Sequence, residues 1–374
     1  MHVCILNNGY GEDKAAAAIA RALREICPSV EVTGAPLVTS GDDFTKQGFE
    51  VLVHGDVPPS GGFPLKSLRG FLLDTLFTPK YYRYYAKLKQ LRARIDYPVV
   101  VGDVALLLIA YLALRKKPVF VDLAKSSYKG PHFRAEEAML RRFPRKVITR
   151  DQYTCDYLRG KRVDAIFLGN PMMDGLIPKG LDLGDDPIVG ILPGSREEAY
   201  ENLRRILLAV DRSREDATFV CGLPSCLSVE RIADTVKADG WILEHNVLSK
   251  NGKAVSMIED GFADVITKSQ VIIGLAGSAN EQAVGMGTPV ITFAGIGAQT
   301  TARRMRSQQR LLGESVKFVQ DVPDGVAAEL SFLLSDADER ARRGRIGMQR
   351  MGPPGGSEAI ARFLIGQFDL APSS

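Results

Sequence analysis

The sequence predicts an α/β protein made of two doubly wound, Rossmann-like domains. Short apolar runs alternate with helical patterns along the chain, which is typical of parallel strands covered by helices on both faces. This alternation pauses at 169–187, where glycine and proline accumulate, and then restarts. A length of 374 residues, with 45% hydrophobic and 25% charged residues, suits two ordinary globular domains.

Residues 1–170 form the predicted first domain. Its strands are expected at 2–7, 31–34, 51–54, 98–102, 119–122, 147–149 and 165–168, with helices between them, for example over 12–26, 104–115 and 135–142. The run 104–115 is apolar but too short to cross a bilayer, so we expect it to be a buried helix.

The predicted second domain covers 187–356 and follows a linker at 171–186. Its strands are expected at 188–192, 218–221, 241–243, 271–274 and 289–293, and its helices at 198–210, 261–269, 280–286, 326–334 and 336–350. A last helix is expected over 357–368, after the break "MGPPGGS".

Composition limits the compartment and the partners. The cysteines are odd in number and scattered, which favours reduced thiols in a cytoplasmic protein; they are Cys4, Cys27, Cys155, Cys221 and Cys226. The chain opens on a predicted strand without the pattern of a signal peptide. A net charge of +4 is too mild to indicate a nucleic-acid partner.

Ligands of doubly wound sheets bind at the carboxyl ends of the strands, so the turns there are the candidate sites. The first turn, "NNGYGED", carries Gly9 and Gly11, followed by Glu12 and Asp13. A dinucleotide fingerprint would need a third glycine where Lys14 stands, so NAD is not expected. The carboxylates either favour the helix N-terminus, or they bind a sugar hydroxyl or act as a base.

A second turn follows the apolar run "VVVG" and carries Asp103. Aspartate at this position can cap the next helix. It can also project a carboxylate for general-base catalysis, and the two roles are compatible.

Two turns of the second domain are suited to an anion. "LPGSR" contains Gly194, Ser195, as a possible helix cap, and Arg196, whose cation would be unfavourable at a helix start unless an anion bound there. "GSANEQ", from 277 to 282, opens a helix with free backbone N–H groups. Glu281 can accept hydrogen bonds from a ribose diol, or it can be the capping-box partner of Ser278.

Five segments together resemble the GT-B glycosyltransferases, and among them most closely the lipid-A-disaccharide synthases and their relatives. In the family's order these segments are "GEDKAAAAIARAL", "VVVGD", "LGNPMMD", "ILPGSREE" and "GLAGSANEQAVGMGTPVI". The resemblance implies two domains that face each other across a cleft, with the last helix crossing back to the first domain. It implies transfer of a sugar from a UDP-sugar to a lipid-linked acceptor, with inversion and without a bound metal or other cofactor.

The resemblance also assigns roles to residues. Glu281 would bind the ribose of UDP, and the donor-binding set would be Gly194, Ser195, Arg196, Gly277, Ser278, Ala279, Asn280, Glu281 and Gln282. Asp103 is favoured as the base, with Glu12 and Asp13 as alternatives, while Gly9, Gly11 and Asn170 would lie on the acceptor side. The first turn, Asn170 in place of the family's His, and the segment 294–313 depart from the family pattern. We therefore expect a relative with a different acceptor.

The segment 71–95 combines an apolar half with a basic, tyrosine-rich half. Such a segment favours contact with an anionic membrane, on the inner face in this case, through Tyr81, Tyr82, Arg83, Tyr84 and Lys87. The alternative is an ordinary helix that packs its Tyr and Leu side chains inward.

Two other functions fit the same architecture: a UDP-sugar 2-epimerase and a non-catalytic binding protein. An epimerase needs acid and base groups around the sugar, often histidines, and the histidines here lie in no matching motif; they are His2, His54, His132 and His245.

Overall fold

The computed structural model describes residues 1–55, 78–185 and 187–370. The chain forms two compact units, the first comprising Met1–Gly175 with Gly352–Ser374 and the second Leu176–Met351. The predicted linker divides between them. Residues 179–181 are fastened to the second unit because their N–H groups donate to the Asp264 carboxylate at 2.8–2.9 Å.

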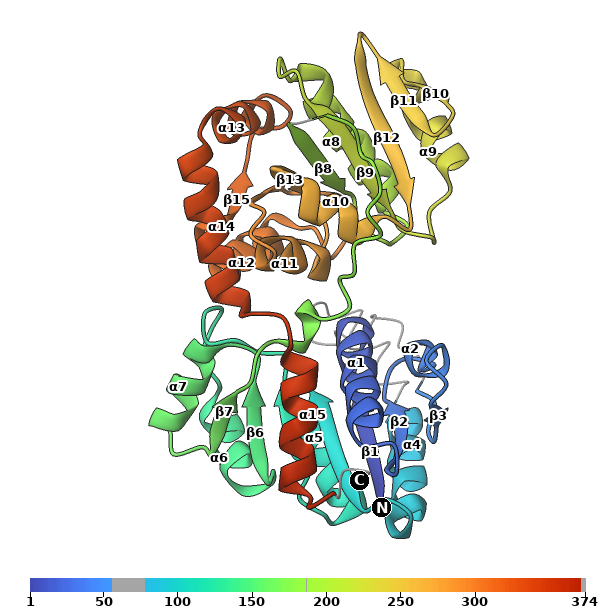
Figure 1. The fold of residues 1–374 in the computed structure, drawn as a ribbon, viewed down its shortest axis with the longest axis vertical. Coiled ribbons are helices and arrows are strands. Elements are labelled where there is room, and N and C mark those ends of the chain that lie inside the picture. Colours follow the sequence, from blue (N-terminus) through green and yellow to red (C-terminus); the bar gives the residue numbers. More distant parts are fainter. Residues whose placement is uncertain (56–77, 186, 371–374) are drawn as a thin grey trace. The chain divides into compact units, whose positions relative to one another are not determined.

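The first unit is built on an all-parallel sheet with the strand order β3-β2-β1-β4-β5-β6-β7 (Figure 1). Its strands are β1 (His2–Asn7), β2 (Glu31–Pro36), β3 (Glu50–Val51), β4 (Tyr97–Gly102), β5 (Val119–Asp122), β6 (Lys146–Thr149) and β7 (Ala165–Phe167). All seven predicted strands are present, although the one expected at 51–54 is only the short edge strand β3.

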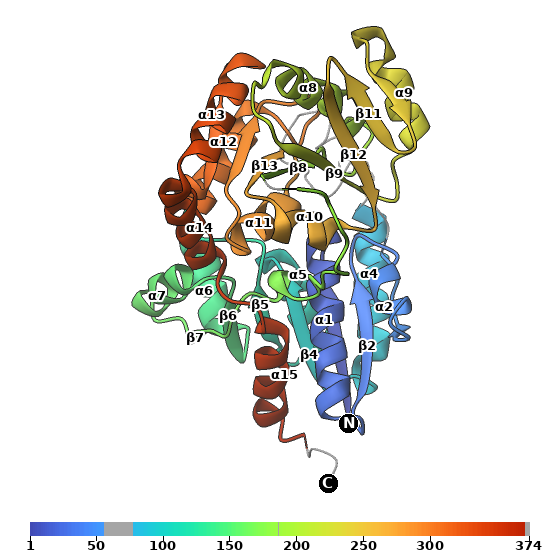
Figure 2. The same ribbon diagram turned by 45° about the horizontal axis from the view of Figure 1, so that its top comes forward.

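Helices cover both faces of this sheet. One face packs on α1 (Tyr10–Ile26), α2 (Asp42–Thr45) and α15 (Gly356–Gln367). The other packs on α4 (Thr78–Gln90), α5 (Val104–Leu114), α6 (Arg134–Arg142) and α7 (Gln152–Gly160). α5 is largely buried, as predicted. α15 belongs to the first unit and lies beside α1 in both views, so the last helix does cross back to the first domain (Figures 1 and 2).

The second unit has a mixed sheet with the strand order β10-β11-β12-β9-β8-β13-β14-β15. Its strands are β8 (Ile188–Leu192), β9 (Thr218–Leu223), β10 (Ile242–Glu244), β11 (Val247–Lys250), β12 (Lys253–Glu259), β13 (Val271–Gly274), β14 (Val290–Phe293) and β15 (Val316–Val319). Among the strand pairs of this sheet that the structure describes, only β10–β11 and β11–β12 are antiparallel. β11, β12 and β15 were not predicted, because these strands are short or alternate between apolar and polar residues, and they lie toward the edges of the sheet.

The helices of the second unit complete its two layers. They are α8 (Ala199–Arg212), α9 (Val229–Val236), α10 (Phe262–Lys268), α11 (Ser278–Gly285), α12 (Ala302–Leu312), α13 (Asp324–Ser335) and α14 (Ala337–Met351). α8, α9 and α13 bury one face of the sheet, while α10 and α11 lie next to each other on the opposite face (Figure 2).

Each sheet has one point where the order of the strands reverses. In the first unit the chain goes from β1 to β2 on one side and later places β4 on the other side. In the second unit β9 lies on one side of β8 and β13 on the other. The crevice at the carboxyl ends of strands at such a switch point is where doubly wound sheets bind ligands. The turns after β1, β4, β8 and β13 are therefore the places to examine.

Candidate functional site

The two predicted donor turns meet at the switch point of the second unit. The Leu275 N–H, just after β13, donates to the Leu192 carbonyl at the end of β8 at 2.9 Å. Gly194 has a φ of +102°, a left-handed conformation that favours glycine, and a Cβ there would lie 3.5 Å from the Leu275 oxygen. The backbones of the two turns are thus close neighbours.

Arg196 lies in the first of these turns, with its residue exposed. The helix begins later than predicted, at Ala199, and its N-cap is Glu198. Ser195 is therefore not the cap, and Arg196 is not in the first helical turn. Instead the Ser195 carbonyl accepts the Cys226 thiol at 3.2 Å, from the turn after β9. Arg196 is thus an exposed residue on a turn at the switch point, and a guanidinium can bind an anionic group in a bidentate manner.

The second donor turn does not have the capping box between Ser278 and Glu281 that the sequence allowed as an alternative. α11 starts at Ser278 and its N-cap is Gly277, without a side-chain cap. Ser278 is thus the first helical residue and Glu281 the fourth, one position beyond a capping box. Gly277 and Ser278 are exposed, and Ala279, Glu281 and Gln282 are half-buried. The exposed residues place backbone N–H groups at the start of the helix, where an anion is favoured.

Asn280 needs a correction. Its side chain is fully buried, so it does not reach a ligand as predicted. Its Nδ2 donates to the Gly274 carbonyl at 3.1 Å and to Gln308 Oε1 at 3.0 Å. Asn280 therefore belongs to the internal support of the turn.

The two carboxylate-bearing turns of the first unit also meet at a switch point. The Asp103 N–H, after β4, donates to Asn8 Oδ1, after β1, at 3.3 Å. Asp103 is the N-cap of α5, and its Oδ1 accepts the Leu106 N–H at 2.9 Å. The residue is half-buried. The predicted capping role is therefore observed, and it leaves part of the residue exposed at the switch point.

Asp13 and Glu12 lie in the first turn of α1, whose N-cap is Gly9 and whose second residue is Gly11. Asp13 is only 5% exposed and accepts a hydrogen bond from the Asn7 side chain. Burial raises the pKa of Asp13 to about 6, and nearby Asp43 and Glu12 add to the increase. Glu12 is half-buried. A pKa of about 6 suits a base near neutral pH, whereas Asp103 is the more accessible residue.

Asn170 also needs a correction. It was predicted to lie on the acceptor side, but it is fully buried. Its Oδ1 accepts the Met172 N–H at 3.1 Å and so caps the short 3₁₀ helix Pro171–Met173. A Cβ on Gly356 would lie only 2.7 Å from the Asn170 carbonyl carbon, so this segment packs tightly against the start of α15. Asn170 positions backbone and has no exposed surface for an acceptor.

A buried acid–histidine pair lies one strand away from Asp103. Asp122 ends β5 in register with Gly102, and its Oδ2 is 2.8 Å from His132 Nε2. Both side chains are at most 1% exposed. Burial raises the pKa of Asp122, and the hydrogen bond to His132 opposes that increase. This hydrogen bond links the segment between Asp122 and His132 to the end of β5 in the interior of the unit.

The predicted membrane residues on the basic helix α4 include both exposed and buried side chains. Tyr84 is buried, and its hydroxyl donates to the Ala35 carbonyl at 2.5 Å, so it packs inward and is unavailable to a membrane. Tyr82 is 69% exposed, Arg83 and Lys87 are exposed, and Tyr81 is half-buried. Residues 71–77 of the predicted segment lie outside the described residues. In the described ranges, no helix is long and apolar enough to span a membrane.

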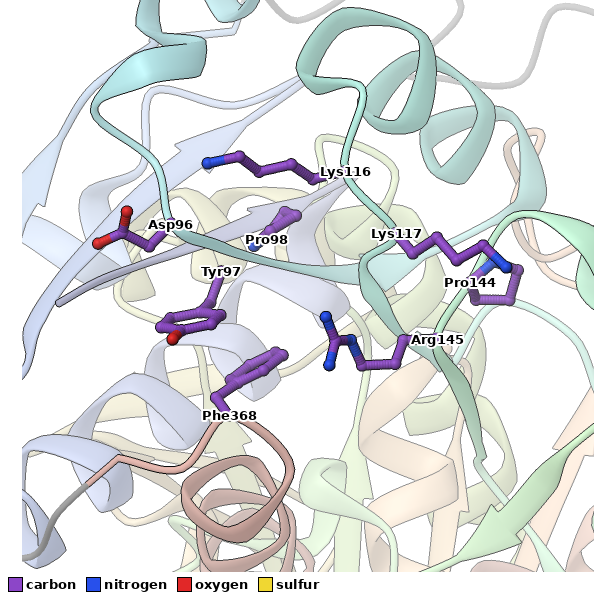
Figure 3. Close-up of a pocket in the computed structure, with 8 residues that line it drawn as sticks. All are labelled: Asp96, Tyr97, Pro98, Lys116, Lys117, Pro144, Arg145 and Phe368. Carbon is purple, nitrogen blue, oxygen red and sulfur yellow. The ribbon is translucent and has the colours of Figure 1, made fainter.

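A cavity of about 490 Å³ lies at the end of the first sheet where β4, β5 and β6 begin (Figure 3). Its basic residues do not converge. Lys116 donates to the Ile95 carbonyl at 2.5 Å. The Lys117 side chain extends in the opposite direction from that of Lys116, and Arg145 points toward the stacked rings of Tyr97 and Phe368 (Figure 3). The cavity is remote from the switch point and includes none of the predicted site residues.

Sequence reasoning missed three residues that shape these turns. Asn8 and Asp122 each follow or end an apolar strand, which is the same signal that pointed to Asp103. Gln308 lies on α12, a helix that was not predicted, and no local pattern marks it.

Comparison with known proteins supports this architecture. No family model matches the chain. Over 234 residues it is 26% identical to a lipid-A-disaccharide synthase from Syntrophotalea carbinolica, an alignment that covers 55% of this chain and 57% of that protein. The chain thus spans little more than half the length of the curated relative it matches.

Solved structures match over nearly the whole chain. CalG4, the calicheamicin glycosyltransferase, matches with a TM-score of 0.67 and 13% identity over 98% of both chains. MurG from Acinetobacter baumannii matches with 0.62 and 14% identity over 98% of this chain and 99% of its own. A UDP-GlcNAc 2-epimerase from Neisseria meningitidis, bound to UDP-GlcNAc, matches with 0.61 and 16% identity over 98% and 100%. The chain therefore has the fold of the GT-B glycosyltransferases, which UDP-GlcNAc 2-epimerases share, and it is similar in sequence to a lipid-A-disaccharide synthase.

Proposed function

We propose that this protein is a glycosyltransferase that moves a sugar from a UDP-sugar to a lipid-linked acceptor, with inversion and without a metal. The observation that carries the proposal is the pairing of turns at the two switch points. In the second unit, Arg196 and the N-terminus of α11 offer positive charge and N–H donors. In the first unit, Asp103 and Asp13 offer carboxylates.

The second unit would bind the donor. The diphosphate oxygens would accept hydrogen bonds from the N–H groups at 277–279 and from the Arg196 guanidinium. Glu281, half-buried on the first turns of α11, would accept hydrogen bonds from the ribose hydroxyls. As the bond from the sugar to the diphosphate breaks, these groups would stabilise the negative charge that develops on UDP.

The first unit would bind the acceptor and supply the base. Asp103 would take the proton of the acceptor hydroxyl, whose oxygen would bond to the anomeric carbon on the face opposite the leaving UDP. We favour Asp103 because it is the more exposed of the two: Asp103 is half-buried, whereas Asp13 is almost wholly enclosed. Asp13 would then act as a second acidic group beside the acceptor.

The lipid nature of the acceptor rests on the lipid-A-disaccharide synthase relative and on α4. The exposed side chains Tyr82, Arg83 and Lys87 combine an aromatic ring with positive charge, which suits the surface of an anionic bilayer. We propose that α4 makes peripheral contact with such a membrane.

The fold neighbours keep a UDP-sugar 2-epimerase as the second candidate. One experiment separates the two functions. The protein is incubated with labelled UDP-sugars in D₂O, with and without a lipid extract. A transferase releases UDP and moves label into lipid only when the extract is present. An epimerase exchanges deuterium into C2 of the sugar without the extract, and that result would overturn the transferase.

A further inference from the structure

The turn proposed to bind UDP is held by a buried side chain from another helix. Gln308 of α12 is 7% exposed. Its Nε2 donates to the carbonyl oxygens of Ala276, at 3.3 Å, and Gly277, at 2.9 Å. One amide group therefore holds two successive carbonyls of the turn between β13 and α11.

The other end of the same amide holds the start of α11. Gln308 Oε1 accepts the Asn280 Nδ2 at 3.0 Å, and that Nδ2 also donates to the Gly274 carbonyl at 3.1 Å. The network thus joins the end of β13, the turn and the first turn of α11. All of these groups belong to the second unit.

Because the peptide group is planar, these contacts also determine the direction of the N–H groups on the ligand side. In a trans peptide the carbonyl oxygen and the next N–H point in opposite directions. When Gln308 draws the carbonyls of Ala276 and Gly277 inward, the N–H groups of Gly277 and Ser278 are turned away from Gln308. Gly277 and Ser278 are both exposed, so these N–H groups face the side from which a ligand can approach.

We infer that Gln308 is a positioning residue that orients the anion-binding N–H groups of the turn 275–278; this inference rests on the proposed binding of UDP there. Only an amide serves this place, because the two carbonyls need a donor while Asn280 needs an acceptor. A carboxylate would lack the donor, and an aliphatic side chain would lack both. Buried polar networks lose much of their value when one member is missing.

The test replaces the donor and keeps the shape, with Gln308→Glu. The matched control is Gln309→Glu on the same helix, where the side-chain oxygen accepts the Phe318 N–H at 3.2 Å and a carboxylate can still accept. UDP is titrated calorimetrically into both variants and the wild type at pH 8 and pH 5.5. The quantity compared is the ratio of variant to wild-type Kd at each pH.

At pH 8 we expect the ratio to be roughly tenfold or more for Gln308→Glu and near one for the control. At pH 5.5 it should fall toward one, because the protonated carboxyl can donate to a carbonyl again. A ratio within twofold of one at pH 8 would overturn the inference, as would a loss of affinity that does not depend on pH. Failure of the wild type to bind UDP would instead overturn the proposed donor site, and the inference with it.

A second variant covers the case in which Gln308→Glu does not fold at pH 8. Gln308→Met is neutral and similar in shape, so it should weaken UDP binding at both pH values without recovery. Amide hydrogen exchange at 275–280 should become faster in this variant and stay unchanged in Gln309→Glu. Unchanged exchange together with unchanged affinity would contradict the role of Gln308.

Discussion

At the scale of single residues, the acidic groups of the first unit carry the sharpest electrostatic consequence. Asp13 is buried and its pKa is raised to about 6, so folding disfavours its charged form. The stability that this group contributes is fully present below its unfolded pKa, near 4, and is lost as the pH rises through 6.

The variant Asp13→Asn should therefore be more stable than the wild type at pH 8, by up to about 3 kcal/mol, because one pKa unit corresponds to about 1.4 kcal/mol. The difference should disappear toward pH 4. Urea unfolding at pH 4, 6 and 8 measures it, with the exposed Asp182→Asn as a control. A stability difference that is the same at all three pH values would show that Asp13 is not perturbed.

Asp103 combines a structural and a proposed chemical role that two variants separate. Asn caps a helix about as well as Asp, so Asp103→Asn should fold with nearly unchanged stability, while Asp103→Ala should lose about 1 kcal/mol. Because Asn cannot take a proton, we expect the rate of sugar transfer to fall about 10²- to 10⁴-fold in both variants. Transfer at the wild-type rate by Asp103→Asn would exclude this residue as the base.

The sequence indicated strand-end residues correctly but not their burial. Asp103 lies where the apolar run before it predicted, since the end of a strand is a local property. Asn170, Asn280 and Tyr84 turned out to be buried. Their burial depends on neighbours from distant segments, such as Gly356 beside Asn170, and no local pattern carries that information.

At the scale of elements, the return of the last helix to the first unit depends on a specific anchor. The Asp174 carboxylate accepts the N–H groups of Gly355 at 2.6 Å and Ser357 at 2.5 Å, at the start of α15. A carboxylate at this position satisfies backbone donors and also favours the positive end of the helix dipole.

Asp174→Ala should lower the free energy of unfolding by roughly 1–3 kcal/mol and make α15 more accessible to proteases. Glu358→Ala removes an exposed ion pair with Arg362 in the same helix and should change stability by less than about 1 kcal/mol. Denaturant unfolding and limited proteolysis measure both. Equal effects of the two variants would contradict the anchoring role of Asp174.

The proposed membrane contact is also a property of one element, α4. The double variant Arg83→Glu and Lys87→Glu reverses two exposed charges, each worth about 1 kcal/mol near an anionic surface. It should lose sedimentation with vesicles that contain anionic lipid. Lys46→Glu, on the other face of the sheet, is the control. Binding that survives the double variant, or binding to neutral vesicles alone, would place the contact elsewhere.

Helices and strands with a clear apolar period were predicted, whereas elements that depend on their neighbours were not. α12 was missed because its residues are mostly basic and polar, and only Met305, Gln308, Leu311 and Leu312 face the interior. The residue that we infer to orient the donor turn lies on this helix. A part of the site was thus hidden in an element that tertiary packing defines.

At the scale of the whole molecule, the order of elements and the five family-like segments predicted the GT-B fold, and the solved structures confirm it. The reaction could not be read in the same way, because transferases and epimerases share this fold. What distinguishes them is the chemistry at the turns, and the proposed function depends on the binding of UDP by the second unit.

Calorimetric titration with UDP tests that claim most directly, using the wild type, Arg196→Ala and Arg214→Ala. Arg214 is an exposed arginine between α8 and β9, just before β9 begins, whereas Arg196 follows the end of β8. We predict micromolar binding by the wild type and Arg214→Ala, and at least a tenfold loss in Arg196→Ala, because a charge-assisted contact with the diphosphate is removed. No binding by the wild type, or equal binding by all three proteins, would show that the second unit does not bind UDP through Arg196.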